Sequence, residues 1–284
     1  MSETAAPGPA PEAALSLTQR IHRVYAELPA QERAVADLAL DAPGEVAVWT
    51  AAELAQRAGV SAPTVSRLFR RLGYDSAEAA RRAARAMRAA GSPLYLAARD
   101  GAAAPQADIA AVEMTLSMLN PLTVADVADA LARARRVRVL GFRNSAFVAD
   151  YLRGALAVFR PDVEALTGPG QTLAERLADL APGDMAVAVG LRRRPAQFAA
   201  AMRALSGSGA DLALIADRSV RAAPASARWT LLCAVETSDA LDTYAGALAL
   251  ARRLALETGR RLGAGGRRRI EAVEALHDAL GELE

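Results

Sequence analysis

The segment from Thr50 to Gly73 constrains the fold more than any other part of the sequence, because it predicts two short helices joined by a tight turn. Thr50 and Glu53 form a capping box, the Ser/Thr-x-x-Glu pattern that satisfies free amides at a helix start. Gly59 is placed to take the left-handed conformation that ends this helix. Ser61 follows as a suitable N-cap for the second helix. The segment therefore predicts a helical hairpin whose turn is set by its own residues.

The second helix of this segment is expected to have one apolar and one polar face. Its apolar residues follow helical spacing and are Val65, Leu68, Phe69 and Leu72. The opposite face carries hydroxyl and guanidinium groups. Such a helix behind a short capped helix is typical of a helix-turn-helix, whose second helix enters the major groove of DNA. The predicted DNA-contacting residues are Ser61, Ala62, Thr64, Ser66, Arg67, Arg70 and Arg71. An ordinary helical hairpin with a solvated basic face is the alternative.

The local charge favours the DNA-binding interpretation. The net charge of the chain is only +2, but residues 57–88 contain eight arginines and two acidic residues, a local excess of six positive charges. A patch of this kind attracts the phosphate backbone of nucleic acids. All 34 basic side chains are arginine, which together with the abundant alanine is typical of GC-rich coding. Arginine abundance alone is therefore weak evidence of function.

Composition and periodicity divide the chain into four parts. Residues 1–14 are rich in Pro and Ala, lack the features of a secretory signal, and are expected to be a disordered tail. Residues 15–90 predict an all-helical domain of about five helices. Residues 91–106 lose periodicity and carry Gly and Pro, so they are interpreted as a linker. Residues 107–284 begin with two helical patterns and then change character.

In this last part, short β-prone runs alternate with helical patterns. The predicted strands are Val137–Gly141, Val163–Leu166, Met185–Gly190, Leu212–Asp217 and Trp229–Val235. The longer helices between them are expected at Ser145–Phe159, Gln171–Leu180 and Ala196–Ser208. Strands that alternate with helices indicate βαβ units. The expected fold is therefore multidomain, with the all-α domain followed by a doubly wound α/β domain that has a five-stranded parallel sheet.

Helical periodicity returns after the last strand. A long helix is expected from about Ser238 to Thr258, ended by Gly259, and a last amphipathic helix at Ile270–Leu283. Between them, the basic run Arg260–Arg269 is interpreted as a solvated turn, with a second DNA contact as the alternative.

Several classes of site are not expected. The single Cys233 rules out an intrachain disulfide and fits a reducing, cytoplasmic compartment. The sequence has no uninterrupted run of 18 apolar residues, so no membrane span is predicted. The chain has two histidines and no Cys/His cluster, so neither a metal site nor another cofactor is predicted. Glu236 and Asp239 follow the last strand, where a sugar isomerase could place a base, but one carboxylate at a strand end is more often a helix cap. No catalytic residue is assigned.

Together these residues resemble the RpiR/MurR family of bacterial transcription regulators, which join an N-terminal helix-turn-helix domain to a C-terminal sugar isomerase (SIS) domain. The resemblance covers nearly the whole chain after the tail. It is most specific in LPAQERAVADLALDAPGEVAVWTAAELAQRAGVSAPTVSRLFRRLGYDSAEAARR, including the Leu72-Gly73-Tyr74 exit. It implies a regulator that binds double-stranded operator DNA and senses a small anionic metabolite, such as a sugar phosphate or a sugar acid. A sugar-phosphate isomerase with an accessory helical domain is the alternative.

We also expect at least a homodimer, because one recognition helix covers too few base pairs for useful specificity and such helices act in pairs. The last helices, rich in Leu and Ala, are the candidate dimer surface. Dimer and tetramer are both left open.

The chain departs from the family pattern in the two loops that hold the ligand. The first is usually Gly-x-Gly-x-Ser but reads Gly141-Phe142-Arg143-Asn144-Ser145, with arginine at the second glycine. The second is usually Ser-x-Ser-Gly-x-Thr, and its four fixed positions are Gly190, Arg192, Arg193 and Pro195. The strand order 2-1-3-4-5 that the resemblance implies brings both loops to one switch point. The predicted ligand-binding residues are Arg143, Asn144, Ser145, Arg192, Arg193 and Arg194. Alternatively, the arginines at 192–194 are solvated or pair with acids across a dimer.

Overall fold

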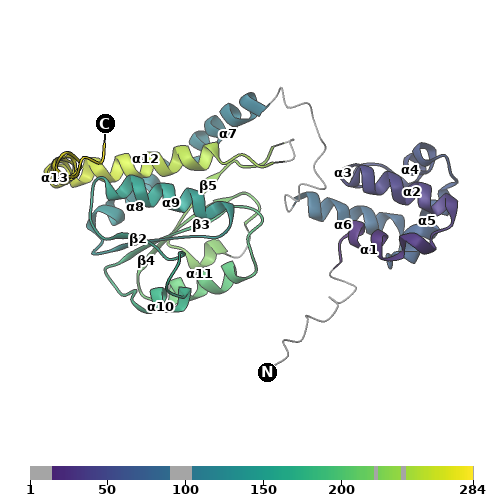
Figure 1. Cartoon of the computed structure of the whole chain (residues 1–284), viewed down its shortest axis with the longest axis horizontal. Helices are drawn as coiled ribbons and strands as arrows, with labels where there is room; N and C mark the ends of the chain where they lie inside the picture. Colours follow the sequence, from purple (N-terminus) through teal and green to yellow (C-terminus); the bar gives the residue numbers. More distant parts are fainter. Residues whose placement is uncertain (1–14, 90–103, 221–222, 238–240, 284) are drawn as a thin grey trace. The chain divides into compact units, whose positions relative to one another are not determined.

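The computed structural model describes residues 15–89, 104–220, 223–237 and 241–283. It separates an all-helical unit before residue 101 from an α/β unit after it (Figure 1). This confirms the predicted fold class. The expected tail at 1–14 and all but the last three residues of the expected linker at 91–106 lie outside the described residues.

The helical unit contains more elements than the sequence suggested. The described part has α1 (Leu17–Val24), the 3₁₀ turn η2 (Tyr25–Glu27), α2 (Ala30–Asp41), α3 (Pro43–Val46), α4 (Ala51–Ala58), α5 (Ala62–Arg71) and α6 (Ala77–Ala89). The expectation of about five helices is therefore too low. It missed α3 because Pro43-Gly44 reads as a helix break, whereas Pro43 occupies the first turn of α3, where its missing amide costs little.

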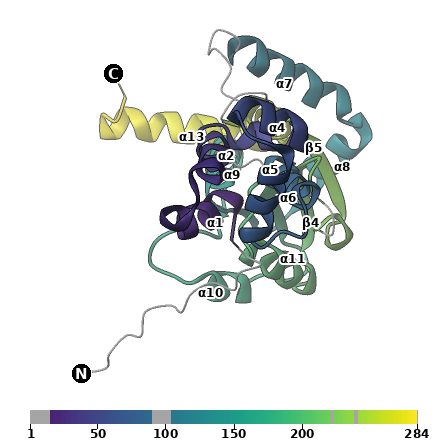
Figure 2. The same cartoon turned by 90° about the vertical axis from the view of Figure 1, so that its right-hand side faces the viewer.

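The core of the helical unit forms around α4 and α5. Leu54 of α4 and three residues of α5, Val65, Leu68 and Phe69, are fully buried. These are apolar positions that helical spacing predicted. Figure 2 shows α4, α5 and α6 bundled with α1 and α2. The buried apolar side of α5 leaves its opposite side available for contact with other molecules.

The α/β unit has one parallel sheet with the order β2-β1-β3-β4-β5, as the resemblance implied. Its strands are β1 (Val137–Gly141), β2 (Val163–Ala165), β3 (Met185–Gly190), β4 (Asp211–Asp217) and β5 (Trp229–Cys233). In register, Gly141 at the end of β1 is opposite Val189 near the end of β3. The loops after these two neighbouring strands therefore leave the sheet side by side.

Helices cover both faces of the sheet. They are α7 (Ala104–Met118), α8 (Pro121–Arg133), α9 (Asn144–Ala157), α10 (Leu173–Ala178), α11 (Gln197–Gly207), the 3₁₀ turn η5 (Ala223–Ser226), α12 (Ala245–Leu262) and α13 (Ala264–Leu280). Alternate residues of β3 face opposite sides: Val187 packs with α8, α9 and α12, whereas Ala188 packs with α11. None of the helices in the described part is long and apolar enough to cross a bilayer.

The C-terminal helices differ from the expectation. α12 begins at Ala245 rather than Ser238, and residues 238–240 lie outside the described part. Gly259 lies inside α12, not at its end. A Cβ at Gly259 would lie 2.7 Å from Phe159 Cδ1, so this glycine permits close packing instead of ending the helix. The expected turn at Arg260–Arg269 is wrong: the run is helical except at Gly263, where φ is 53° and ψ is −122°.

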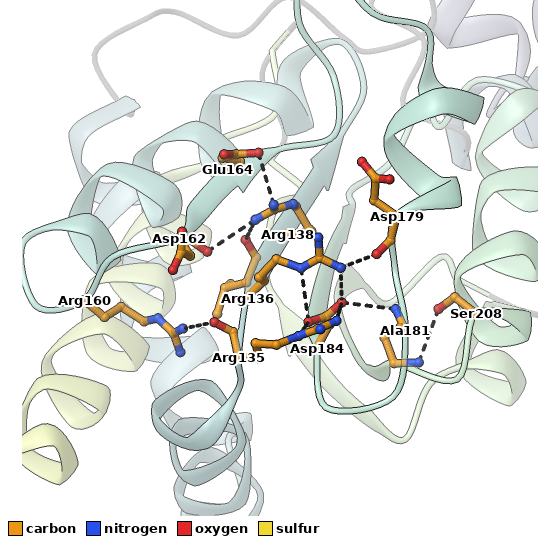
Figure 3. A network of polar contacts seen from close by, with 12 residues as sticks. Arg135, Arg136, Arg138, Arg160, Asp162, Glu164, Asp179, Ala181, Asp184 and Ser208 are labelled. Atoms are coloured by element: carbon orange, nitrogen blue, oxygen red, sulfur yellow. Dashed lines mark hydrogen bonds and ion pairs between the residues drawn. The ribbon is translucent and has the colours of Figure 1, made fainter.

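A network of ion pairs lies at the amino ends of β1 and β3 (Figure 3). The fully buried Asp184 carboxylate accepts hydrogen bonds from Arg135 Nε at 3.0 Å and Arg136 Nη2 at 2.7 Å. Arg160 donates to the carbonyls of Leu131 and Ala134 and so caps the last turn of α8. The arginines at this edge of the sheet thus have partners within the fold.

Candidate DNA-binding and ligand-binding sites

The α4–α5 hairpin has the predicted helix-turn-helix geometry. The Thr50 amide donates to Glu53 Oε2 at 2.6 Å, and the Glu53 amide donates to Thr50 Oγ1 at 3.2 Å, which completes the capping box. The Thr50 amide and the Thr50 hydroxyl both donate to the Glu53 carboxylate, and these two hydrogen bonds lower the pKa of Glu53. Gly59 ends α4 with φ 66° and ψ 32°, the left-handed conformation. The turn expected from the sequence is therefore present.

The predicted DNA-contacting residues do not all lie on the surface. Ser61, Ala62, Arg67, Arg70 and Arg71 are exposed and Ser66 is half-buried, whereas Thr64 is 1% exposed. Thr64 Oγ1 shares a hydrogen bond with Ser61 Oγ at 2.9 Å and accepts one from Arg67 Nη2 at 3.1 Å. Ser61 therefore uses its hydroxyl on Thr64 rather than on the helix backbone. Thr64 acts as an anchor that orients Arg67.

The basic side chains around α5 differ in how tightly they are held. Arg71 Nε pairs with the buried Glu32 Oε2 of α2 at 2.9 Å. Arg81 and Arg85 of α6 both pair with Glu78. Within the described residues, Arg70 and Arg67 form no ion pair, and both are exposed on the α5 surface. These two guanidiniums of α5 are therefore available for a phosphate or a base.

In the α/β unit, direct contacts join the two predicted ligand loops. The Leu191 amide donates to Ser145 Oγ at 3.1 Å, and Arg143 Nη1 donates to the Arg193 carbonyl at 3.3 Å. Gly141 makes the close turn possible, because a Cβ there would lie 2.4 Å from the Ser145 carbonyl oxygen. The structure therefore brings together the loops that the sequence predicted to meet.

Two of the loop arginines form ion pairs with acids of the same domain. Arg192 is almost fully buried and pairs with the equally buried Asp242, with Nε 2.9 Å from Oδ2, and with Glu236 at 3.2 Å. Arg194 Nη1 lies 2.6 Å from Asp217 Oδ1. From the sequence, solvation or pairing with acids across a dimer was the alternative to ligand binding for these arginines. The acids come instead from Asp217 at the end of β4 and from the segment that follows β5, within the same chain.

The other two loop arginines are exposed and strained. Arg143 and Arg193 form no ion pair within the described residues, and their φ angles are 53° and 60°. Positive φ is costly for a side chain of this size, about 1–3 kcal/mol. Both residues stand where the family pattern has glycine, so the loops keep a glycine-like backbone while carrying arginine. Residues in such strained conformations cluster at functional sites, where the surrounding structure holds them.

The remaining predicted ligand-binding residues, Asn144 and Ser145, lie at the start of α9. Asn144 is exposed, and its Nδ2 donates to Tyr244 Oη at 3.3 Å. Ser145 is buried, with its hydroxyl used by Leu191. Sequence reasoning missed Tyr244, which lies about a hundred positions from Asn144 and carries no local signal. Within the described residues, no three His, Cys, Asp or Glu side chains are grouped as they would be around a metal ion.

Comparison with known proteins agrees with this two-part organisation. Residues 15–76 match the model of the helix-turn-helix domain of the rpiR family. An uncharacterized HTH-type transcriptional regulator from Providencia stuartii is 27% identical over 163 residues. That match covers 52% of this chain, and the chain spans only 58% of the length of this curated relative.

Two solved structures share the fold. The sugar isomerase domain of the RpiR transcription factor from Sphaerobacter thermophilus is 26% identical, with a TM-score of 0.57 over 63% of this chain and 99% of that one. The NanR protein of Vibrio vulnificus, solved with ManNAc-6P, is 18% identical, with a TM-score of 0.57 over 93% of this chain and 99% of that one. The chain therefore has a helix-turn-helix domain that matches the rpiR family, and an α/β domain that is similar to the sugar isomerase domain of an RpiR transcription factor follows it.

Proposed function

We propose that this protein is a DNA-binding transcriptional regulator of the bacterial cytoplasm that acts as a homodimer or higher oligomer. Its helical domain binds double-stranded operator DNA. Its α/β domain binds a small anionic metabolite, a sugar phosphate or a sugar acid, and this binding changes operator affinity. The observation that carries the sensing role is the contact between Arg143 and Arg193, two strained arginines on adjoining loops that form no ion pair with the residues the structure describes.

For the DNA-binding role, α5 serves as the recognition helix. Its buried face anchors it to α4, while Arg67 and Arg70 remain exposed. A guanidinium can donate two hydrogen bonds to guanine in the major groove, and Thr64 restricts the directions that Arg67 can take. Two such helices in a dimer read half-sites about one DNA turn apart.

For the sensing role, the two exposed guanidiniums supply positive charge beside a loop that lacks the Ser and Thr hydroxyls of the family pattern. They lie at the carboxyl ends of neighbouring parallel strands, where open α/β sheets bind ligands. Guanidinium groups bind carboxylate and phosphate oxygens bidentately. NanR was solved with a sugar phosphate, which supports the same ligand class here. Arg192 and Arg194 hold the loop in place, and Arg143 and Arg193 bind the anion.

The isomerase alternative finds less support among the described residues. Glu236, which follows β5, pairs with Arg192 at 3.2 Å. The other candidate base, Asp239, lies outside the described residues. We therefore propose a binding role for the α/β domain rather than catalysis.

Selection of duplex DNA by the full-length protein tests the DNA-binding role. We expect an enriched sequence, and Arg67→Ala should weaken binding to it by about 1–3 kcal/mol. Arg23→Ala, which removes an exposed arginine of α1, is the control and should leave affinity nearly unchanged. If the wild type enriches no sequence, the regulator proposal fails.

A further inference from the structure

Helix α7 buries few of its side chains against the α/β domain. From Pro105 to Met118, only Ala111 and Thr115 are buried, and they lie one helical turn apart. At that point α7 lies against the start of α12, where a Cβ at Gly246 would lie 2.2 Å from Thr115 Oγ1. Figures 1 and 2 both show the first turns of α7 projecting from the helices that cover the sheet. A helix held by so few buried side chains can detach locally while the rest of the domain stays folded.

The Thr115 hydroxyl joins α7 to the chain that follows β5. Thr115 is fully buried, and its Oγ1 accepts a hydrogen bond from the Ala234 amide at 3.0 Å. One residue further on, the Val235 carbonyl accepts a hydrogen bond from the Thr243 amide at 3.0 Å, so the chain after β5 lies beside the chain that enters α12. These two stretches, called here the β5–α12 pair, are residues 234–237 and 241–244.

The β5–α12 pair also contacts both ligand loops. The buried Arg192 of the second loop pairs with Glu236 and with Asp242, whose side chain is 6% exposed. From the first loop, Asn144 Nδ2 donates to Tyr244 Oη at 3.3 Å. Each of these loops carries one of the two exposed arginines of the proposed anion site. A connected set of hydrogen bonds and ion pairs therefore runs from the ligand loops to α7.

We propose that the β5–α12 pair couples the ligand loops to α7, and that Thr115 is the residue that fixes α7 to the pair. Along the chain, α7 is the first described helix after the DNA-binding domain, so the chain from that domain enters the α/β domain through α7. An anion that binds the loops more tightly when α7 is attached, or when it is detached, shifts the balance between these two states. The inference rests on the proposed function for its purpose, whereas the connection itself lies within the α/β domain.

Hydrogen exchange of the full-length protein, followed by mass spectrometry without DNA or ligand, tests the hold of Thr115 on α7. Thr115→Val keeps the size of the side chain but removes the oxygen that accepts from the Ala234 amide. We expect α7 peptides to exchange about fivefold faster, because one lost hydrogen bond shifts a local opening equilibrium by roughly that factor. Peptides from α11, on the other face of the sheet, should exchange as in the wild type.

Thr258→Val is the matched control for this substitution. Thr258 is equally buried, but its hydroxyl donates to the Leu254 carbonyl within α12 itself. The control should leave the exchange of α7 unchanged. Unchanged exchange of α7 in Thr115→Val, or an equal increase in Thr258→Val, would overturn the role of Thr115.

The coupling itself is tested at Asp242, which pairs with an arginine of the ligand loop rather than with α7. Asp242→Asn weakens this pair and should also speed the exchange of α7, which a purely local role of Asp242 would not do. Tyr244→Phe removes only the hydroxyl that accepts from Asn144, so it is the milder variant and should give a smaller increase. Asp184→Asn is the matched control, because Asp184 is a buried acid that pairs with arginines at the opposite end of the same sheet.

The exchange of α7 in these three variants decides the proposal. We expect an increase in Asp242→Asn and in Tyr244→Phe, and none in Asp184→Asn. If neither of the first two variants changes the exchange of α7, or if Asp184→Asn raises it as much as Asp242→Asn does, the β5–α12 pair does not couple the loops to α7. These measurements use neither DNA nor an anion, so their failure would leave the regulator proposal standing. The regulator proposal fails separately, if the wild type selects no DNA sequence.

Discussion

The two ends of the parallel sheet carry arginines in opposite circumstances. At the amino end, Arg135 and Arg136 pair with the buried Asp184, and the fold satisfies their charge (Figure 3). At the carboxyl end, Arg143 and Arg193 are exposed, lack acidic partners within the described residues, and have positive φ. On our proposal, the paired arginines at the amino end stabilise the fold, whereas Arg143 and Arg193 at positive φ reduce its stability and serve binding. This comparison predicts opposite effects of mutation at the two ends.

The largest loss of stability should come from replacing Arg192. This arginine lies at the carboxyl end of the sheet, but it pairs with a buried acid, as the arginines at the amino end do. Arg192→Met leaves the Asp242 carboxylate buried without its partner, and breaking a buried pair this way costs about 3 kcal/mol or more. Urea unfolding measures this loss. Arg193→Met is the matched control at the exposed neighbour and should lose little. Equal losses of stability in the two variants would show that burial and pairing do not decide how much each loop arginine contributes to stability.

Asp184→Asn should cost somewhat less, about 2 kcal/mol, because it weakens hydrogen bonds to charged partners that are themselves partly exposed. Asp150→Asn, which removes an exposed acid of α9 paired with Arg153, is the control and should cost under 1 kcal/mol. If the two variants lose the same amount, the amino-end network is not a stabilising feature.

The contribution of Asp184 should also depend on pH. Burial raises its pKa, but hydrogen bonds from Arg136, Arg135 and the Ala181 amide outweigh burial and hold the pKa well below its usual range. A carboxyl group with a lowered folded-state pKa stabilises the fold above its unfolded pKa of about 3.9 and loses that contribution as the pH falls further. The difference between wild type and Asp184→Asn should therefore be constant above about pH 5 and shrink in more acidic solution. A difference that grows with acid would contradict this assignment.

The smallest expected effect is a gain in stability rather than a loss. Arg143→Gly and Arg193→Gly should each stabilise the apo protein by about 1 kcal/mol, because glycine adopts positive φ without strain. Asp162→Gly is the control, since Asp162 has φ 57° but lies at the amino end of the sheet. It should relieve a smaller strain, because aspartate tolerates this conformation better than arginine does.

Much of this fold was predictable because its signals are local. Caps, turn glycines and apolar spacing placed α4 and α5, and β1 and β3 were predicted with their observed bounds. The partners of the loop arginines were not predictable, because Asp217 and Asp242 approach them only through the tertiary fold.

Positions where a local rule was overridden were also missed. Gly259 stays inside α12 because Phe159 packs against it, and Thr64 lies inside a hairpin whose pattern suggested an outward hydroxyl. In the ligand loops, the substitution of arginine for family glycines was visible in the sequence. Only the backbone shows that both arginines have positive φ, a conformation that glycine adopts without strain.

The most direct test of the account compares the wild type with the double variant Arg143→Gly, Arg193→Gly in thermal unfolding. Both proteins are measured alone and with a panel of sugar phosphates and sugar acids. We expect at least one compound to raise the wild-type unfolding temperature, because a ligand that binds only the folded state stabilises it. The double variant should unfold at a higher temperature without ligand and should not respond to that compound. An undiminished response in the double variant, or no response of the wild type to any compound, would contradict the assignment of Arg143 and Arg193 as the anion sensor.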